Sequence, residues 1–268
     1  MRCPSNITGP GDETGGTKAD RLAALRRTVQ GLQSTPVWMG LTDDTGRAGA
    51  SLGRGLAHGL PEAGIPSGVL NEAVASPAHK AASLGFLFTL AAAALRQRKG
   101  LALFIASRRA LDYGVSYGHG LNRLGLDVGR FLLVDAETDK DALWAIEEAL
   151  RSDARPAMVV GTIEGGLDLT QGRRLNLAAA VHATPLVLLR GAKTSAASAA
   201  VTRWRVAPAP AAHDQFGAFG SSRWHVTLER ARNGRTGAWV IEWDASNRRF
   251  RSVPDTSDPS SFDVAAGT

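Results

Sequence analysis

The chain has 268 residues, of which 44% are apolar, and this is enough to form the core of one domain of ordinary size. Its single cysteine, Cys3, excludes a disulfide framework and a cysteine-based metal site and suits a reducing cytoplasm. The longest apolar stretch, residues 84–95, is too short to span a bilayer, and residues 1–20 lack the pattern of a secretory signal. We therefore expect a cytoplasmic protein without a membrane segment.

The formal net charge of +6 is concentrated in one part of the sequence. Residues 190–251 contain eleven Lys or Arg against four Asp or Glu, an excess of seven positive charges. Such a segment fits an anionic partner, either an acidic protein surface or nucleic-acid phosphates. It equally fits a solvated, arginine-rich surface.

The N-terminal region is expected to precede the folded core. Residues 1–20 are rich in Gly, Thr, Ser, Asp and Pro, a composition that predicts disorder. Asp20 then caps a helix over residues 21–33, and a glycine-rich connector completes the segment 21–59. The apolar residues of this helix recur at helical spacing: Leu22, Leu25, Val29 and Leu32. This stripe predicts docking on another subunit or back on the chain's own core.

Between residues 60 and 201, short apolar runs alternate with longer amphipathic ones, a pattern typical of a parallel sheet with crossover helices. Strands are expected at residues 69–74, 101–106, 131–134, 157–163 and 185–189. Helices are expected between them at residues 77–98, 115–124, 139–151 and 169–182, with Trp144 turned toward the core. Right-handed crossovers then give an α/β fold, a twisted parallel sheet flanked by helices.

The pattern changes after residue 201. Strands with alternating apolar and polar residues are expected at 202–207, 224–230 and 239–244, and Asn233-Gly234 is a typical hairpin turn. Residues 202–252 are therefore interpreted as an antiparallel β extension at the C-terminus. Residues 253–268, rich in Ser, Asp and Pro, are expected to be disordered.

Residues 101–163 resemble the core of the RecA recombinases. Residues 104–112, Phe-Ile-Ala-Ser-Arg-Arg-Ala-Leu-Asp, are similar to the RecA segment in which a strand leads into the catalytic glutamate and then Ala-Leu-Asp. Further similar residues follow in the same order and spacing, among them Gly125, Asp127 and Thr138. The resemblance implies a RecA-like, P-loop-type core.

The phosphate loop of that family is degenerate in this sequence. Such a loop needs glycines whose amides bind phosphate, followed by Lys and Ser or Thr. Here the segment runs from Ala75 through Lys80 to Ser83 without a glycine. It also contains Pro77, which has no amide hydrogen.

Two acidic positions of the family are lost as well. The aspartate that holds Mg²⁺ is replaced by Gly161. The glutamate that orients the attacking water is replaced by Arg108, which cannot act as a general base. We therefore expect no catalytic residue, no nucleotide cofactor and no metal.

Within the RecA-like group, the chain resembles the ImuA family, accessory proteins of the inducible mutagenesis cassette of bacteria. The resemblance is carried by residues 142–150, 167–175, 186–190, 200–210 and 237–243, and its most specific block is Thr-Arg-Trp-Arg-Val at 202–206. It implies a non-catalytic protein of the SOS response that assists mutagenic translesion synthesis. The implied partners are the Y-family-like protein ImuB, an error-prone replicative-type DNA polymerase and RecA.

The candidate partner-binding residues lie in the β extension, where arginines stand beside aromatic residues, as in interface hot spots. They are Arg203, Trp204, Arg205, Arg230, Arg232 and Arg235. On a strand, Arg203 and Arg205 share one face and Trp204 lies on the other. Core packing of the tryptophans beside solvated arginines is the alternative. Direct DNA binding stays open, because the loop at residues 193–200 is shorter than its RecA counterpart.

Two other functions compete with this interpretation. A SulA-like inhibitor of cell division, which binds FtsZ, also uses a RecA-related fold without ATPase chemistry, although SulA-like chains are shorter. An active RecA-type ATPase is the second competing function, and the degenerate loop at residues 75–83 argues against it. Recovery of ImuB together with the chain from damaged cells would support the accessory role in mutagenesis, whereas recovery of FtsZ would support the cell-division inhibitor.

Overall fold

A computed structural model describes residues 64–110, 116–191, 198–211, 220–232, 234 and 236–253. All of them belong to one structural unit, Pro36–Thr268. The expected N-terminal disorder, the helix at 21–33 and its connector lie outside the described residues. So do Arg235 and the expected tail beyond Val253.

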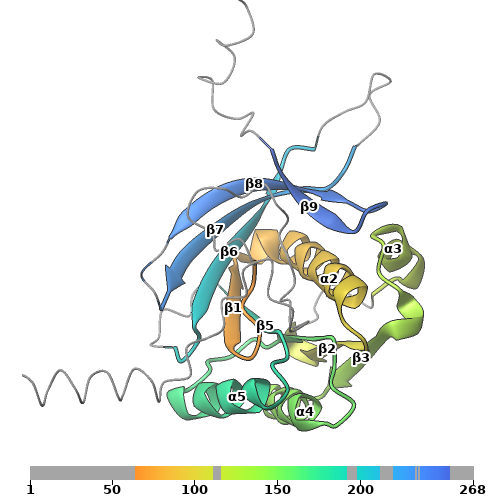
Figure 1. The fold of residues 1–268 in the computed structure, drawn as a ribbon. Helices are drawn as coiled ribbons and strands as arrows, with labels where there is room; N and C mark the ends of the chain where they lie inside the picture. Colours follow the sequence, from red (N-terminus) through yellow and green to blue (C-terminus); the bar gives the residue numbers. More distant parts are fainter. Residues whose placement is uncertain are drawn as a thin grey trace, which may run out of the picture. The chain divides into compact units, whose positions relative to one another are not determined.

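A nine-stranded sheet in the order β3-β2-β4-β5-β1-β6-β7-β8-β9 organises the described part of the chain (Figure 1). Neighbouring strands are parallel from β3 to β6 and antiparallel from β6 to β9. The strands are β1 (Leu70–Ala75), β2 (Ala102–Ser107), β3 (Phe131–Ala136), β4 (Met158–Thr162), β5 (Leu186–Gly191), β6 (Thr202–Ala209), β7 (Arg223–Ala231), β8 (Gly237–Asp244) and β9 (Arg249–Val253).

Helices cover both faces of the parallel part of the sheet. They are η1 (Pro77–His79), α2 (Lys80–Gln97), η2 (Arg108–Ala110), α3 (Gly118–Arg123), η3 (Val128–Arg130), α4 (Asp139–Arg151) and α5 (Leu169–Val181). α2 packs on one face, and α4 and α5 pack side by side on the other (Figure 1). Because both faces are covered, β1, β4 and nearly all of β5 are buried, which explains why they are mostly apolar.

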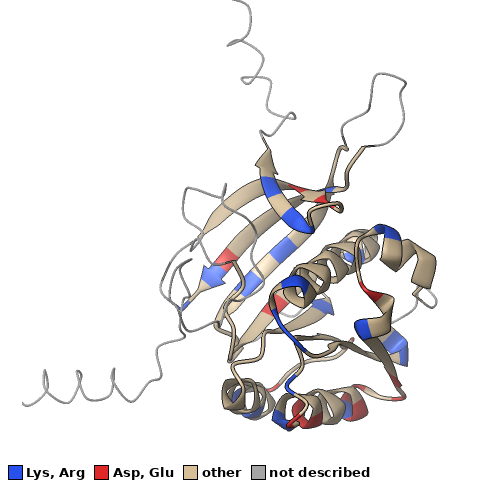
Figure 2. Cartoon of the chain, turned by 45° about the vertical axis from the view of Figure 1, so that its right-hand side comes forward, with Lys and Arg blue, Asp and Glu red and all other residues tan. Residues whose placement is uncertain are grey.

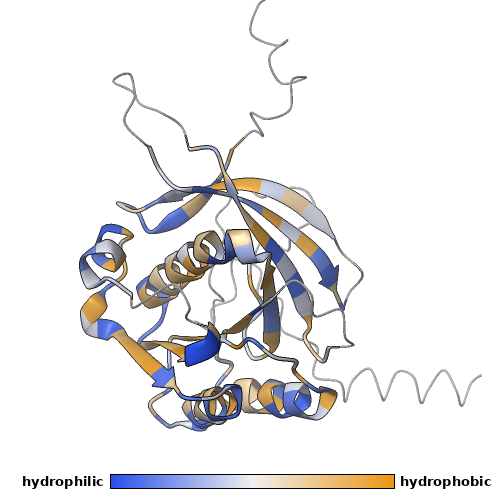
Figure 3. Ribbon diagram, turned by 180° about the vertical axis from the view of Figure 1, so that it is seen from behind, coloured by the Kyte–Doolittle hydropathy of each residue, from blue (hydrophilic) through white to orange (hydrophobic). Residues whose placement is uncertain are grey.

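α2 is the centre of the larger buried cluster. From Ser83 to Leu95 every residue except Gly85 is buried, so the helix is apolar on all sides (Figure 3). By length and hydropathy the segment Pro77–Gln97 is also sufficient to cross a membrane, and it is longer than the apolar stretch taken from the sequence. However, 67% of an apolar 18-residue stretch within this segment is buried inside the protein, so core packing accounts for its composition.

The antiparallel strands curve over α2 and complete its surroundings (Figure 1). Trp224 of β7 contacts Phe86 of α2 with ring centroids 5.8 Å apart, and its Nε1 donates to the carbonyl oxygen of Ala82 at 2.8 Å. Trp243 of β8 packs on Phe250 of β9 with centroids 4.7 Å apart. The extension therefore has a structural role, because without it the face of α2 turned away from the parallel strands would be exposed.

The predicted fold class, α/β with a parallel sheet flanked by helices and antiparallel C-terminal strands, is confirmed. β6 pairs antiparallel with β7, as the sequence pattern predicts, and its other edge lies parallel beside β1, with Asn71 opposite Thr202, a pairing that the pattern does not predict. The side chains of these two residues explain the pairing, since Thr202 Oγ1 donates to Asn71 Oδ1 at 2.7 Å. β9 is not predicted by the sequence pattern, because Phe250 is its single buried apolar residue.

The prediction that Trp144 is turned toward the core is wrong. The buried residues of α4 form one stripe, Ala142, Ile146 and Leu150. Trp144 follows Ala142 by two residues, which corresponds to about 200° around the helix. It is 65% exposed and faces away from the sheet.

Candidate functional site

The degenerate P-loop lies at the carboxyl-terminal ends of the parallel strands. β1 ends at Ala75, and α2 begins at Lys80 after the single turn η1. Pro77 opens this turn without an amide hydrogen, and the amide of His79 donates to the Ser76 carbonyl oxygen at 3.0 Å. The amide of Lys80 donates to the Pro77 carbonyl oxygen. These amides bond within the turn instead of forming the concave cradle that a phosphate requires.

Lys80 forms an ion pair across the same edge of the sheet. Its Nζ lies 3.2 Å from Oε2 of Glu164, in the loop that follows β4. The side chain of Lys80 is 13% exposed and that of Glu164 is 55% exposed. The ammonium group therefore already has a counter-charge from the chain itself.

Asp139, the first residue of α4, positions the loop that carries Glu164. Its carboxylate accepts the backbone amides of Glu164 at 3.2 Å and Gly165 at 2.7 Å, and the hydroxyl of Ser107 donates to it. Burial alone would raise the pKa of Asp139, but these hydrogen bonds and the charge of Arg109 outweigh it and lower the pKa. The ionised carboxylate thus ties the ends of β2 and β4 to α4.

Ser83 is buried beneath β6. Its Oγ lies 3.0 Å from the carbonyl oxygen of His79 and 3.1 Å from that of Val206. A serine that served a Mg²⁺ ion would need its hydroxyl oxygen open toward the phosphates. Here β6 covers it, so Ser83 joins α2 to the sheet.

The two positions of lost acidic residues have structural occupants. A Cβ at Gly161 would lie 2.5 Å from Cδ1 of Ile146 and 2.8 Å from Cδ1 of Leu188, so α4 and β5 fill the space beside it. The side chain of Arg108 is 68% exposed, and its Nε lies 3.4 Å from Oδ2 of Asp135. Neither position holds a carboxylate that could serve Mg²⁺ or water.

A buried charge cluster is centred on Glu72 in β1, three residues before Ala75, where the degenerate loop begins. Glu72 is fully buried and accepts hydrogen bonds from Arg190 Nη1 at 2.8 Å and from Ser198 Oγ at 2.6 Å. Nε and Nη2 of Arg203 both donate to its second carboxylate oxygen, at 3.0 and 2.9 Å. Burial raises the pKa of Glu72, but the bonds from Ser198, Arg203 and Arg190 outweigh it and lower the pKa.

The structure divides the candidate partner-binding residues. Trp204 is 1% exposed and its Nε1 donates to Thr202 Oγ1 at 2.8 Å, so its assignment as a partner contact is wrong and the core-packing alternative holds for it. The side chain of Arg203 is 15% exposed and serves Glu72. Arg205 is 45% exposed and pairs with Glu229.

Arg230 and Arg232 are exposed at the end of β7, and Arg235 lies outside the described residues. The sequence interpretation overlooked Glu72 and Asp139. A charged residue inside the apolar run of β1 was a usable signal for Glu72, because a buried charge requires partners. Asp139 gave no such signal, since acidic residues are common in the first turn of a helix.

Taken together, the sheet order and the flanking helices define an α/β protein whose arrangement is consistent with a RecA-like fold. The chain matches no protein-family model. It is 35% identical to Protein ImuA of two strains of Caulobacter vibrioides over 187 residues, which covers 64% of this chain and 72% of the relative in each case. The chain belongs to the ImuA family. This relationship supports a role in the ImuA/ImuB mutagenesis cassette family, as the sequence blocks indicated.

Proposed function

We propose that the chain is a non-catalytic accessory protein of SOS-induced damage tolerance, which acts in mutagenic translesion synthesis through contacts with other proteins. The observation that carries the proposal is the ion pair between Lys80 and Glu164 at 3.2 Å. In a working P-loop the lysine binds the β- and γ-phosphates of the nucleotide. A phosphate here would have to displace a carboxylate that belongs to a fixed loop.

The surroundings support the same conclusion. Asp139 holds the Glu164 loop through two backbone amides, and Ser83 is covered by Val206. Opening the site would therefore break several hydrogen bonds in addition to the ion pair. The position of Arg108 holds a guanidinium group, which cannot act as the general base that hydrolysis needs.

The proposed partners are those of the cassette: an ImuB-like Y-family protein, an error-prone replicative-type DNA polymerase and RecA, in the cytoplasm. The exposed arginines at the end of β7, Arg230 and Arg232, together with Arg205, are the proposed contact residues. Planar guanidinium groups bind carboxylates of a partner with two parallel hydrogen bonds. Arg203 and Trp204 stabilise the strands behind them.

Two measurements test the non-catalytic role. Calorimetry of the intact chain with Mg²⁺-ATP at millimolar concentration should show no saturable heat, and Lys80→Ala should leave damage-induced mutagenesis intact. Saturable binding at micromolar affinity, or loss of mutagenesis in a folded Lys80→Ala variant, contradicts the proposal.

The contact residues need a separate test. The double variant Arg230→Ala/Arg232→Ala should reduce recovery of the ImuB-like partner from damaged cells. The matched control Arg123→Ala/Arg248→Ala removes the same charge from two exposed arginines, one on α3 and one in the turn between β8 and β9, and should keep that recovery. Recovery of FtsZ in place of the ImuB-like partner would favour the cell-division inhibitor.

A further inference from the structure

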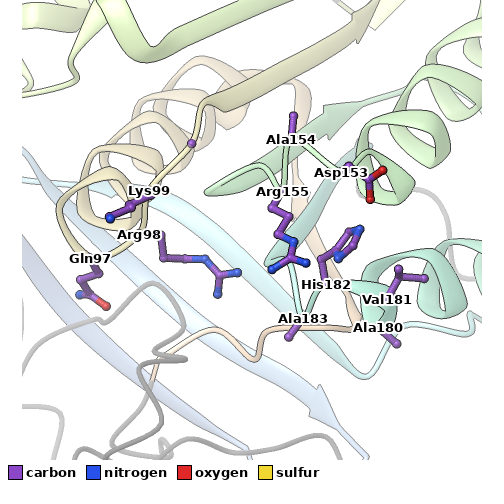
Figure 4. A pocket seen from close by; sticks show the side chains of 11 residues that line it. Gln97, Arg98, Lys99, Asp153, Ala154, Arg155, Ala180, Val181, His182 and Ala183 are labelled. Carbon is purple, nitrogen blue, oxygen red and sulfur yellow. The ribbon is translucent and has the colours of Figure 1, made fainter.

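A cavity of about 580 Å³ lies at the amino-terminal ends of the parallel strands, the opposite edge from the degenerate P-loop. Its walls come from residues 97–100 between α2 and β2, 153–155 between α4 and β4, and 180–183 between α5 and β5 (Figure 4). Figure 4 shows three basic side chains directed into the space between these loops: Arg98, Arg155 and His182.

A second hollow of about 380 Å³ adjoins the first. The two share residues 97–100, and the second adds Leu95, Arg96 and Arg130. We call the two hollows together the amino-edge groove. Two adjoining hollows that both carry cations fit a linear polyanion better than a compact ligand.

The amino-edge groove is strongly positive. Its five Lys or Arg side chains are Arg96, Arg98, Lys99, Arg130 and Arg155, and its one carboxylate is Asp153. Within the part of the chain that the structure describes, the side chains of Lys99 and Arg155 form no ion pair and no hydrogen bond. Cations that converge without a carboxylate between them repel one another, and a bound anion removes that repulsion.

The arginines of the antiparallel strands are in a different electrostatic situation (Figure 2). Glu72 forms ion pairs with both Arg190 and Arg203. Three further pairs follow the same pattern: Arg205 with Glu229, Arg223 with Glu242, and Arg251 with Asp244. These five arginines thus have a carboxylate partner within the fold, whereas Lys99 and Arg155 of the amino-edge groove have none among the described residues.

The backbone of the groove is held in place by its own contacts. Arg130 donates to the carbonyl oxygens of Leu95 at 2.9 Å and Arg98 at 2.8 Å, so it caps the end of α2 and fixes the following loop. Gly100 has φ +94°, and a Cβ there would lie 2.7 Å from the carbonyl oxygen of Arg155, so this close approach requires glycine. Arg155 itself has φ +47°, an uncommon conformation for a non-glycine residue. The backbone that carries these cations is thus already ordered, so on binding a ligand only their side chains lose freedom.

We propose that the amino-edge groove binds the phosphate backbone of nucleic acid without sequence specificity. Guanidinium groups match phosphate oxygens geometrically, and Lys99 adds a mobile point charge. None of the groove residues is Trp, Tyr or Phe, the anchors that protein interfaces favour, which argues against a protein partner. The same absence leaves no platform for base stacking, so the contacts are with phosphates. This inference goes beyond the proposed function and does not depend on it.

The test uses the full chain and a double variant, Lys99→Gln/Arg155→Gln. Neither side chain forms a hydrogen bond or an ion pair within the described structure, so the variant should fold. Circular dichroism and thermal melting verify that it does. The control, Arg123→Gln/Arg173→Gln, removes the same charge from two exposed arginines outside the groove, one on α3 and one on α5. Fluorescence anisotropy with two unrelated labelled single-stranded oligonucleotides, from about 50 to 200 mM salt, measures affinity and its salt dependence.

The wild-type chain and the control should bind both oligonucleotides equally. The groove variant should bind both more weakly, and the slope of log affinity against log salt should fall by about 1.4, about 0.7 for each phosphate that is no longer neutralised. An equal loss in the control, or unchanged binding by the groove variant, overturns the location. Absence of oligonucleotide binding at low salt overturns the ligand class, and binding of a labelled poly-glutamate peptide instead assigns the groove to an acidic protein.

Discussion

The carboxylate of Glu72 and Nη1 of Arg190 lie 2.8 Å apart, with side chains 0% and 1% exposed. Arg203 of β6 binds the same carboxylate from the other side of β1. One buried carboxylate therefore joins β5, β1 and β6, at the place where the sheet passes toward its antiparallel strands. A buried charge is tolerated only with partners, so we expect the cluster to favour β6 as the neighbour of β1.

Glu72→Gln should destabilise the protein strongly. The amide cannot neutralise Arg190 and Arg203, which would then remain as uncompensated positive charges in or near the core. Breaking a buried pair in this way costs about 3 to 5 kcal/mol. Urea unfolding followed by circular dichroism measures the change. Glu229→Gln, which removes the partner of the half-exposed Arg205, is the matched control and should cost about 1 kcal/mol or less. Equal effects of the two variants would contradict the role of the cluster.

The stability that the ionised carboxylate of Asp244 contributes should be lost in acid. The side chain and backbone amide of Asn247 donate to its carboxylate at 2.8 and 3.0 Å, Arg251 adds a further bond, and together they hold the pKa well below its usual value of 3.8. A carboxyl with a lowered pKa in the folded state contributes stability above the unfolded pKa and loses it as the pH falls. Asp244→Asn should therefore be less stable than wild type at pH 7, and the difference should shrink below about pH 4. A difference in unfolding free energy between wild type and Asp244→Asn that stays the same at all pH values would contradict this linkage.

Much of the fold followed from local patterns, because strands buried on both faces are mostly apolar and α4 keeps its stripe of Ala142, Ile146 and Leu150. What local patterns could not supply was the pairing of distant strands. The parallel position of β6 depends on Asn71 and Thr202, 131 residues apart, and on Glu72 with Arg203. The amino-edge groove could not be predicted for the same reason, since its cations come from the end of α2 and the loop after it, from η3 and from the loop before β4.

Gly161 should resist substitution for a packing reason. Because a Cβ there would lie 2.5 Å from Cδ1 of Ile146, Gly161→Ala should cost about 1 to 3 kcal/mol. Ile146→Val removes that methyl group and alone should cost about 0.5 to 1.5 kcal/mol. The double variant should be more stable than the sum of the two costs predicts, which a double-mutant cycle of urea unfolding measures. Strict additivity would show that Ile146 does not determine the requirement for glycine.

Restoring the aspartate should not restore a nucleotide site. Gly161→Asp would place a carboxylate against Ile146 and Leu188, so the variant should be less stable than Gly161→Ala and should still show no heat with Mg²⁺-ATP. A stable, nucleotide-binding Gly161→Asp variant would show instead that this single loss inactivated the site.

Trp144 is an exposed aromatic residue with no structural task in the described part of the chain. It is 65% exposed and borders a hollow of about 200 Å³ between α4 and α5, with Leu143 and Leu175 in the same lining. Beside it Arg174 and Glu147 form an ion pair at 2.7 Å that stiffens the contact between the two helices. A rigid aromatic side chain next to a small apolar hollow has the character of an interface anchor.

Trp144→Ala should therefore separate stability from binding. Its free energy of unfolding should change by no more than about 0.5 kcal/mol, because the side chain buries little surface in the isolated chain. If the residue anchors the ImuB-like partner, affinity should fall by about 2 kcal/mol, which is roughly thirtyfold. Tyr117→Ala is the matched control, since Tyr117 is 70% exposed and lies on a different part of the fold, at the start of α3. Surface plasmon resonance against the partner measures both variants. A folded Trp144→Ala variant that binds as tightly as Tyr117→Ala would show that this helix face is not part of the interface. A large loss of stability in Trp144→Ala would show that Trp144 packs more tightly than its exposure indicates.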